Sequence, residues 1–277
     1  MMRAFAADDG EWLHVAVSGA GPAIVMLHGW TSSHAAWNPL VADLARRHTL
    51  VRWDARGHGG HGLATATVPG VQRMARDLQN LLDHCQLAEA VLVGHSMGAL
   101  TIWEYVRTFG NSRIAKLCIV DQSPKLVTDA DWPHGIFGDF DASRSQDFID
   151  ELQSDFAEAV LRLAAFGRNA DARRRYEEDS RGWRQSREAL RRLDPAPLIA
   201  TWRSLVASDY RGVLRAIDVP TLLVYGSESN FYGEATARWV QARIAASQLH
   251  LYGGADHSPH LMQPERFARD LAAFVAT

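Results

Sequence analysis

The chain has few cysteines, no long apolar run and no basic tract, and each shortage excludes a class of protein. Cys85 and Cys118 are the only cysteines among 277 residues, too few for a disulfide framework. No stretch of about 18 apolar residues is present, so no membrane-spanning helix is expected. The formal net charge is −3, and no run of basic residues alternates with aromatic ones. Nucleic acid is therefore not an expected partner.

The sequence also lacks the signals of secretion and of metal binding. Residues 1–10 contain no apolar run of signal-peptide length. Both cysteines stand in apolar segments, which favours a reducing compartment, and we expect a cytoplasmic location. His58 and His61 lie close together, but no third ligand stands at metal spacing and the motif H-E-x-x-H is missing. We therefore expect neither a metal nor a cofactor, and the oligomeric state stays open.

What the sequence does contain is an alternation of strands and helices. Residues 11–18 alternate between apolar and polar and predict an edge strand. A continuous apolar run, typical of a strand covered on both faces, occurs at residues 23–27, and further strands are predicted at residues 50–53, 91–93, 115–120, 221–225 and 248–252. Helical spacing follows most of these strands. This pattern favours an α/β fold, with a mostly parallel central sheet flanked by helices.

The middle of the chain interrupts this alternation. No buried strand is predicted there, and residues 145–166 show the apolar face of a single helix. Many arginines follow, mixed with acidic residues, and we interpret them as solvated helix faces with i,i+4 pairs rather than as a polyanion site. We therefore expect an α/β core over residues 1–124 and 216–277, and a helical cap over residues 125–215.

A strand, a sharp turn and a helix are predicted around Ser96. The apolar residues 91–93 run into Gly94, Gly98 follows Ser96 by two positions, and helical spacing begins after it. Glycines are needed on both sides because a side chain there would collide with the neighbouring strand or helix. This arrangement is a nucleophile elbow, which exposes the serine hydroxyl above the end of the sheet. We expect Ser96 to be the nucleophile and the Met97 N–H to face negative charge that develops on a substrate.

A histidine is expected to reach Ser96 from a loop near the C-terminus. His257 lies in a turn-rich loop between the last predicted strand and the last helix. His260 is a competitor, but His257 follows the glycine turn at the strand end and is preferred. Asp256, next to it, is interpreted as a carboxylate that caps the loop.

A second loop is expected to complete an oxyanion hole. His28, Gly29 and Trp30 directly follow the buried strand at residues 23–27. Gly29 would let the loop bend over the strand end, and the Trp30 N–H would then join the Met97 N–H. The alternative is a loop that merely ends the strand.

Four motifs together resemble the α/β-hydrolase superfamily. They are His28-Gly29, Asp54–Gly59, Gly94–Gly98 and Gly254–His257, and the order of serine, acid and histidine along the chain also matches. The resemblance covers the chain apart from the cap. It is specific for the superfamily and implies an α/β-hydrolase fold, but it implies little about the substrate.

The acid departs from the commonest pattern of that superfamily. The pattern implies an aspartate three residues after Gly226, where this chain has Ser229. Some members instead carry the acid at the end of the strand after the nucleophile helix, a position that Asp121 occupies here. We expect Asp121 to hold His257 in the productive tautomer, with Glu228 as the rival acid.

The substrate pocket is expected to be apolar and partly built by the cap. Aromatic side chains that could form its walls, or the core of the cap itself, are Trp132, Phe137, Phe140, Trp183 and Trp202. Of these we expect Trp132, Phe137 and Phe140 at the pocket, together with His28.

The leading hypothesis is a serine hydrolase that cleaves a small or medium apolar carboxylic ester, thioester or lactone through an acyl-enzyme on Ser96. Hydrolysis of a carbon–carbon bond uses the same residues and is an alternative. The resemblance offers two further alternatives: a cofactor-free dioxygenase that uses a His–Asp base, and a non-catalytic receptor. Other superfamily members use an aspartate as the nucleophile, and Ser96 at this position argues against their chemistry.

Overall fold

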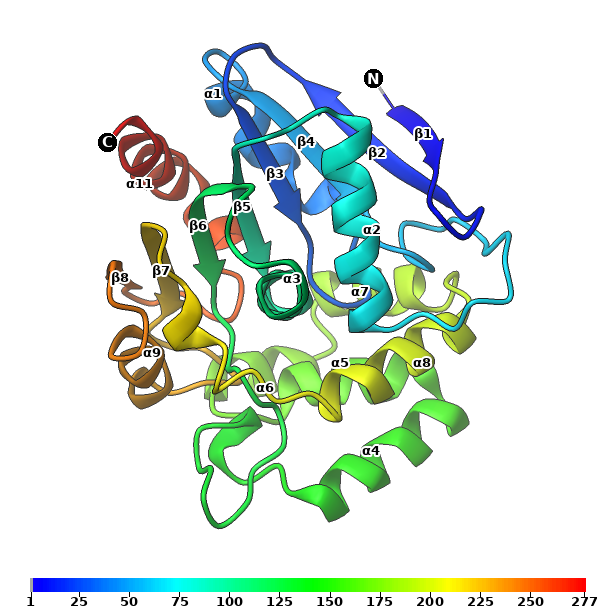
Figure 1. The fold of residues 1–277 in the computed structure, drawn as a ribbon. Helices are drawn as coiled ribbons and strands as arrows, with labels where there is room; N and C mark the ends of the chain where they lie inside the picture. Colours follow the sequence, from blue (N-terminus) through cyan, green and yellow to red (C-terminus); the bar gives the residue numbers. More distant parts are fainter. Residues whose placement is uncertain (1) are drawn as a thin grey trace.

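The computed structural model describes residues 2–277 (Figure 1). Eight strands form one sheet in the order β1-β2-β4-β3-β5-β6-β7-β8. The strands are β1 (Met2–Ala6), β2 (Trp12–Ser18), β3 (Ala23–Leu27), β4 (Thr49–Asp54), β5 (Ala90–His95), β6 (Ile114–Val120), β7 (Thr221–Gly226) and β8 (Ser247–Tyr252). Only the β1–β2 and β2–β4 pairs are antiparallel. The predicted mostly parallel sheet is thus confirmed, although β1 lies outside β2 and is the true edge strand.

Helices cover both faces of this sheet. One face packs against α2 (Val71–His84) and α3 (Met97–Phe109), and the other against α1 (Val41–Leu44) and α11 (Pro264–Ala276). The remaining elements outside the central insertion are α9 (Glu234–Gln241), α10 (Pro259–Met262) and a 3₁₀ helix over His34–Leu40. The buried strands are apolar throughout because successive side chains enter opposite cores: in β3, Val25 and Leu27 face one cluster, and Ile24 and Met26 the other.

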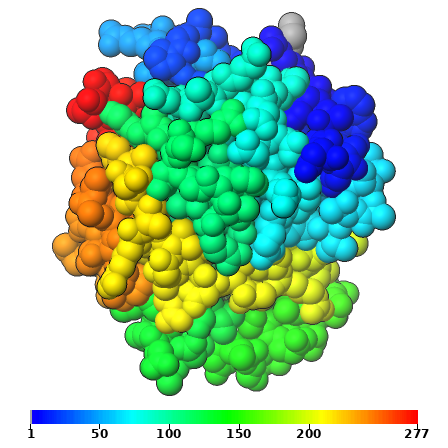
Figure 2. Space-filling model, in the orientation of Figure 1, coloured from blue at the N-terminus to red at the C-terminus, as the bar shows by residue number. Residues whose placement is uncertain are grey.

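A helical insertion joins β6 to β7. It contains α4 (Ala142–Ser154), α5 (Phe156–Ala165), α6 (Ala170–Glu177), α7 (Arg181–Leu190) and α8 (Pro195–Val206), with 3₁₀ turns over Ile136–Gly138 and Leu214–Ala216. None of its segments joins the sheet. Figure 1 places it beyond the arrowheads of β3, β5 and β6, and Figure 2 shows it packed against the body of the molecule.

The single helix predicted over residues 145–166 is wrong, because α4 ends at Ser154 and α5 begins at Phe156. Asp155 causes the break: it leaves the helical region (φ −145°), and its carboxylate accepts a hydrogen bond from the Glu158 N–H. An aspartate cap of this kind competes well with continuation of a helix.

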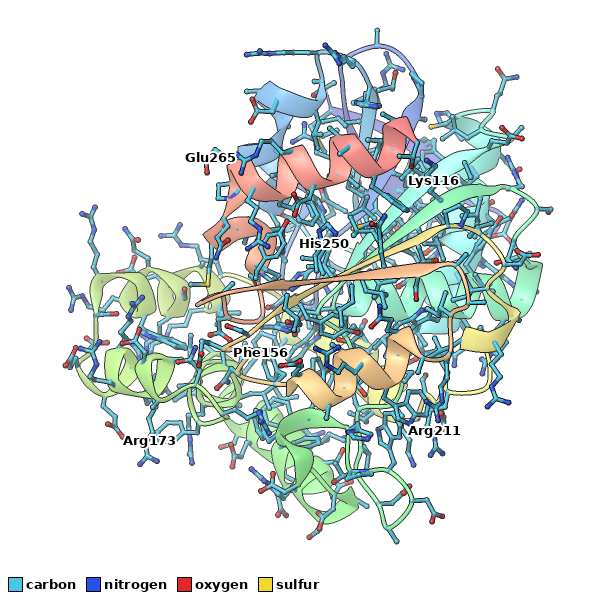
Figure 3. The ribbon with its side chains drawn as sticks, turned by 90° about the vertical axis from the view of Figure 1, so that its left-hand side faces the viewer. Lys116, Phe156, Arg173, Arg211, His250 and Glu265 are labelled. Atoms are coloured by element: carbon cyan, nitrogen blue, oxygen red, sulfur yellow. The ribbon has the colours of Figure 1, made fainter. Side chains whose placement is uncertain are left out.

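The arginines of the insertion form ion pairs on its outer surface. Arg173 pairs with Glu177, and Arg175 pairs with Asp171, each at i,i+4 spacing. Figure 3 shows Arg173 at the outer side of α6, whereas Phe156 of α5 lies further inward. These contacts agree with the interpretation as solvated helix faces. No helix within residues 2–277 is long and apolar enough to cross a membrane.

Candidate active site

Ser96 sits in a strained turn between β5 and α3. Its backbone has φ 52° and ψ −117°, a conformation that costs a non-glycine residue about 1–3 kcal/mol. Gly98 makes the turn possible, because a Cβ at that position would lie 2.2 Å from the Leu27 carbonyl oxygen. The strand, turn and helix expected around Ser96 are therefore present. Met97 occupies the first turn of α3, where backbone N–H groups lack an intrahelical acceptor.

The loop after β3 lies directly against this turn. A Cβ added to Gly29 would lie 3.0 Å from the His95 ring and 3.4 Å from Ser96 Cβ, so the loop packs closely on this turn and a side chain there would press on His95. Trp30, the next residue, lines the same cavity as Ser96. Its indole N–H donates to the Leu198 carbonyl of α8, which ties this loop to the helical insertion.

Asp121 and His257 form a buried hydrogen-bonded pair. His257 Nδ1 lies 2.9 Å from Asp121 Oδ1, and the aspartate is fully buried. Two further donors hold the carboxylate: the Ser229 hydroxyl at 2.8 Å from Oδ1, and the Gly226 N–H at 2.8 Å from Oδ2. Ser229, the residue at the commonest acid position, thus serves here as a hydrogen-bond donor to Asp121.

Burial sets the protonation of this pair. Removal from water disfavours the imidazolium ion, so the pKa of His257 is lowered, and the nearby charge of Asp256 opposes this only in part. Burial raises the pKa of Asp121, while the donors at Gly226 and Ser229 oppose that rise by stabilising the carboxylate. A neutral imidazole whose Nδ1 is held by a carboxylate can accept a proton at Nε2, as a general base must.

The rival residues lie elsewhere. Glu228 is exposed. Its hydrogen bonds are made by its backbone: the N–H donates to the Ala255 carbonyl, and the carbonyl accepts from the Asn169 side-chain amide. His260 is fully buried, with its ring 4.7 Å from that of Trp37, and does not line the cavity that contains Ser96. Asp256 caps the loop as expected, accepting from the backbone N–H of His257.

Ser96 and His257 open into one cavity of about 250 Å³. Side chains from the sheet edge and from the insertion form its walls: Trp30, Met97, Leu100, Gln122, Leu126, Ile136, Val160, Leu163, Trp202, Leu205, Phe231, Tyr232 and Leu261 among them. Most of this lining is apolar, and no lysine, arginine, aspartate or glutamate within residues 2–277 contributes to it.

The expected pocket residues are the main error of the sequence analysis. Both ring nitrogens of the buried His28 already have hydrogen-bond partners in the protein. Nε2 accepts from the Ala55 N–H, and Nδ1 lies 2.7 Å from the Gly29 carbonyl. Trp132 packs on Trp239 of α9 and does not line the cavity of Ser96.

Phe137 and Phe140 line a separate outer groove beside α4, not the cavity of Ser96. Among the aromatic candidates of the sequence analysis, Trp202 does line that cavity, and its other aromatic walls are Trp30, Phe231 and Tyr232. Phe231 and Tyr232 follow the usual acid position closely, and that nearness to the expected site was the signal available in the sequence. Phe231 touches His257 edge-on, with ring centroids 4.4 Å apart.

No group of three or more His, Cys, Asp or Glu side chains within the described part of the chain is arranged to hold a metal ion. Asp54 does gather two histidines, His34 at 2.9 Å and His61 at 3.1 Å. These are hydrogen bonds that fix the loop after β4, outside the lining of the cavity.

The chain is similar to known proteins in sequence and in fold. The chain is 26% identical over 258 residues to a pimeloyl-[acyl-carrier protein] methyl ester esterase of Nitrosomonas europaea, covering 92% of this chain and 96% of that protein. It is 26% identical over 275 residues to 3-oxoadipate enol-lactonase 1 of Acinetobacter baylyi, covering 96% and 94%. An esterase structure from Exiguobacterium antarcticum superimposes with a TM-score of 0.86 at 22% identity, covering 100% of both chains. A family model described as the alpha/beta hydrolase family matches residues 24–270, and the chain belongs to this family.

Proposed function

We propose that the protein is a serine hydrolase that cleaves a small or medium apolar carboxylic ester, thioester or lactone through an acyl-enzyme on Ser96. The observation that carries the proposal is the buried Asp121–His257 hydrogen bond, together with the strained turn that brings Ser96 into the same apolar cavity as His257. The esterases and the lactonase among the relatives act on bonds of this kind.

In the first half of the reaction, the Ser96 oxygen attacks the substrate carbonyl while His257 Nε2 accepts the serine proton. Negative charge moves to the carbonyl oxygen, which receives hydrogen bonds from the Trp30 and Met97 N–H groups. Asp121 stabilises the imidazolium and fixes its tautomer. His257 then passes the proton to the departing alkoxide or thiolate, leaving an acyl group on Ser96.

The second half repeats these steps with water as the nucleophile. His257 removes a proton from water, the hydroxide attacks the acyl carbon, and the proton returns to the Ser96 oxygen as it leaves. A free carboxylic acid is released and the serine is regenerated.

In this proposal the helical insertion, residues 125–215, forms a cap that covers a core made of residues 1–124 and 216–277. It supplies the cavity walls Leu126, Ile136, Trp202 and Leu205, which exclude water from the reacting carbonyl. The apolar lining and the cavity volume of about 250 Å³ favour a short, uncharged acyl group.

The proposal is tested with p-nitrophenyl esters of increasing chain length and with a fluorophosphonate probe. We expect turnover of short esters, and a single covalent adduct by intact mass. Ser96→Ala abolishes both, whereas Ser32→Ala and Ser258→Ala, which remove other serine hydroxyls of the same cavity, still form the adduct. Labelling that persists in folded Ser96→Ala contradicts the proposal.

The buried Asp121–His257 pair favours a second candidate, a cofactor-free dioxygenase in which that pair deprotonates the substrate and Ser96 only binds it. Stoichiometric oxygen uptake with a hydroxyquinolone, surviving Ser96→Ala, would identify this activity.

A further inference from the structure

Apart from Ser96, His257 and the neighbouring His95, whose ring bonds the His257 carbonyl, the wall of the cavity contains a buried polar pair, Gln122 and Tyr232. Thr31, Ser32 and Ser258 also line a large open cleft beside α7, so they mark the mouth of the cavity. Gln122 and Tyr232, in contrast, line the cavity of Ser96 and not the open cleft, and their exposed fractions are only 1% and 4%. Because burial of polar groups is costly unless they are hydrogen-bonded, this pair needs an explanation.

The pair is held rigidly from both sides. The Tyr232 hydroxyl donates to Gln122 Oε1 at 3.2 Å, and Gln122 Nε2 donates to the Ser123 carbonyl at 3.1 Å. The backbone of Gln122 is fixed as well, since its carbonyl accepts from the Tyr225 hydroxyl at 2.6 Å. A ligand therefore meets the pair in a fixed orientation, with little rotamer freedom left to lose.

The pair has hydrogen-bonding capacity to spare. A primary amide carries two N–H donors, and one of the two on Gln122 is used by Ser123. The Tyr232 hydroxyl uses its proton to hold Gln122 Oε1, so the spare donor of the pair is on the amide. The free amide N–H suits an acceptor oxygen on a bound molecule.

That oxygen would lie close to the reacting carbonyl. Gln122 directly follows Asp121, whose carboxylate contacts His257, and the Tyr232 ring centroid is 5.9 Å from that of His257. Gln122 and Ser96 line one cavity of about 250 Å³, so a short acyl chain bound there spans the two residues.

The cavity also selects by charge. No lysine or arginine of residues 2–277 lines it, so a carboxylate on the acyl chain would lose its hydration without gaining a partner. The rim of the open cleft does contain Arg175, but that side chain is exposed and paired with Asp171.

Resting on the proposed ester hydrolysis, we propose that the enzyme is selective for uncharged oxoacyl esters, whose ketone oxygen accepts a hydrogen bond from Gln122 in the pair that Tyr232 orients. A plain acyl chain leaves the amide donor unpaired in the complex. Sites built to hydrogen-bond a substrate discriminate strongly against the analogue that lacks the polar group.

The test compares three p-nitrophenyl esters of equal chain length: 4-oxopentanoate, pentanoate and hydrogen glutarate. Each kcat/KM is divided by the rate constant of spontaneous hydrolysis of the same ester. We expect 4-oxopentanoate to exceed pentanoate by about tenfold or more, and glutarate to be the poorest substrate.

Variants then locate the selectivity. Gln122→Met and Tyr232→Phe should each lower the ratio of the oxo ester to the plain ester by about fivefold or more. Leu205→Met, a matched change of an apolar wall residue, should alter both esters by the same factor and leave their ratio unchanged. If Gln122→Met fails to fold, Tyr232→Phe decides the question, because it removes a single oxygen.

The outcomes separate this inference from the proposed function. Absence of turnover with all three esters overturns both. Turnover with a ratio that neither variant lowers, or with glutarate cleaved as fast as pentanoate, overturns only the selectivity.

Discussion

The carboxyl ends of β6 and β7 are adjacent in the sheet, but they contribute to the site in different ways. β6 ends at Val120 and supplies the buried carboxylate of Asp121. β7 ends at Gly226 and supplies donors to that carboxylate, from its own N–H and from Ser229. The end of β6 thus provides the carboxylate, and the end of β7 provides hydrogen-bond donors to it.

The ends of β6 and β7 bring their side chains to one place. The two positions meet at a single point, since Ser229 Oγ lies 2.8 Å from the same Asp121 oxygen that contacts His257. A carboxylate on either strand end could hold the histidine, and the other end would then be free to supply a hydroxyl donor.

Removal of the charge at the β6 end should have the largest effect. Asp121→Asn keeps the size of the side chain, but its amide cannot stabilise the imidazolium and favours the wrong tautomer of His257. We expect kcat for ester hydrolysis to fall on the order of 10³–10⁴-fold while circular dichroism stays native. A loss in kcat of less than about tenfold would contradict the assignment of Asp121, at the end of β6, as the acid.

Transfer of the charge to the β7 end should recover part of that loss. In the double variant Asp121→Asn, Ser229→Asp, a carboxylate replaces the hydroxyl beside the same position. We expect a gain of about 10- to 100-fold in kcat over Asp121→Asn alone. The uncharged control Asp121→Asn, Ser229→Asn should show no gain, and equal recovery by both double variants would contradict an electrostatic explanation.

Loss of the donor at the β7 end should cost less. Ser229→Ala removes one hydrogen bond to a buried carboxylate, which corresponds to about tenfold in kcat. It should also raise the pKa of Asp121, because the lost donor stabilised the charged form. Since catalysis needs the ionised carboxylate, the acid limb of kcat/KM should move to higher pH.

The matched control for that variant is Ser227→Ala. Ser227 lies in the same loop, and its hydroxyl bonds the Gly254 N–H rather than Asp121. We expect its pH profile to match the wild type. If both serine variants shift the acid limb equally, a general loosening of the loop explains the shift.

The smallest effect is expected at Glu228, the acidic residue of the β7 end. Its exposed position predicts that Glu228→Gln changes kcat and KM by less than about twofold. Steady-state kinetics with a p-nitrophenyl ester provides the measurement. A loss comparable to that of Asp121→Asn would move the acid to β7.

The strand ends could be predicted from the sequence because local chemistry determines them. The turn at Ser96 requires a glycine where Leu27 approaches, and a buried parallel strand that ends in aspartate places that carboxylate at the common edge. The hydrogen bond between Asp121 and His257 follows once both loops lie at that edge. The role of Ser229 could not be foreseen, since a serine in an acid position has no local signature.

The cavity walls could not be predicted, because they depend on how the insertion folds back on the sheet. Phe137 illustrates this: it was expected at the pocket, but it stacks on the outer side of Phe231, with centroids 5.7 Å apart. The N-cap at Asp155 likewise splits one expected helix into the two helices α4 and α5. Spacing along a chain indicates that a face is apolar, but not what it will cover.

The central claim, that β6 rather than β7 supplies the acid, is tested most directly by proton NMR of the His257 Nδ1–H. A ring proton held by a buried carboxylate gives a resonance far downfield of the amide protons. We predict one such signal in the wild type, its loss in Asp121→Asn, and its retention in Glu228→Gln. A signal that survives in Asp121→Asn and disappears in Glu228→Gln would contradict the account.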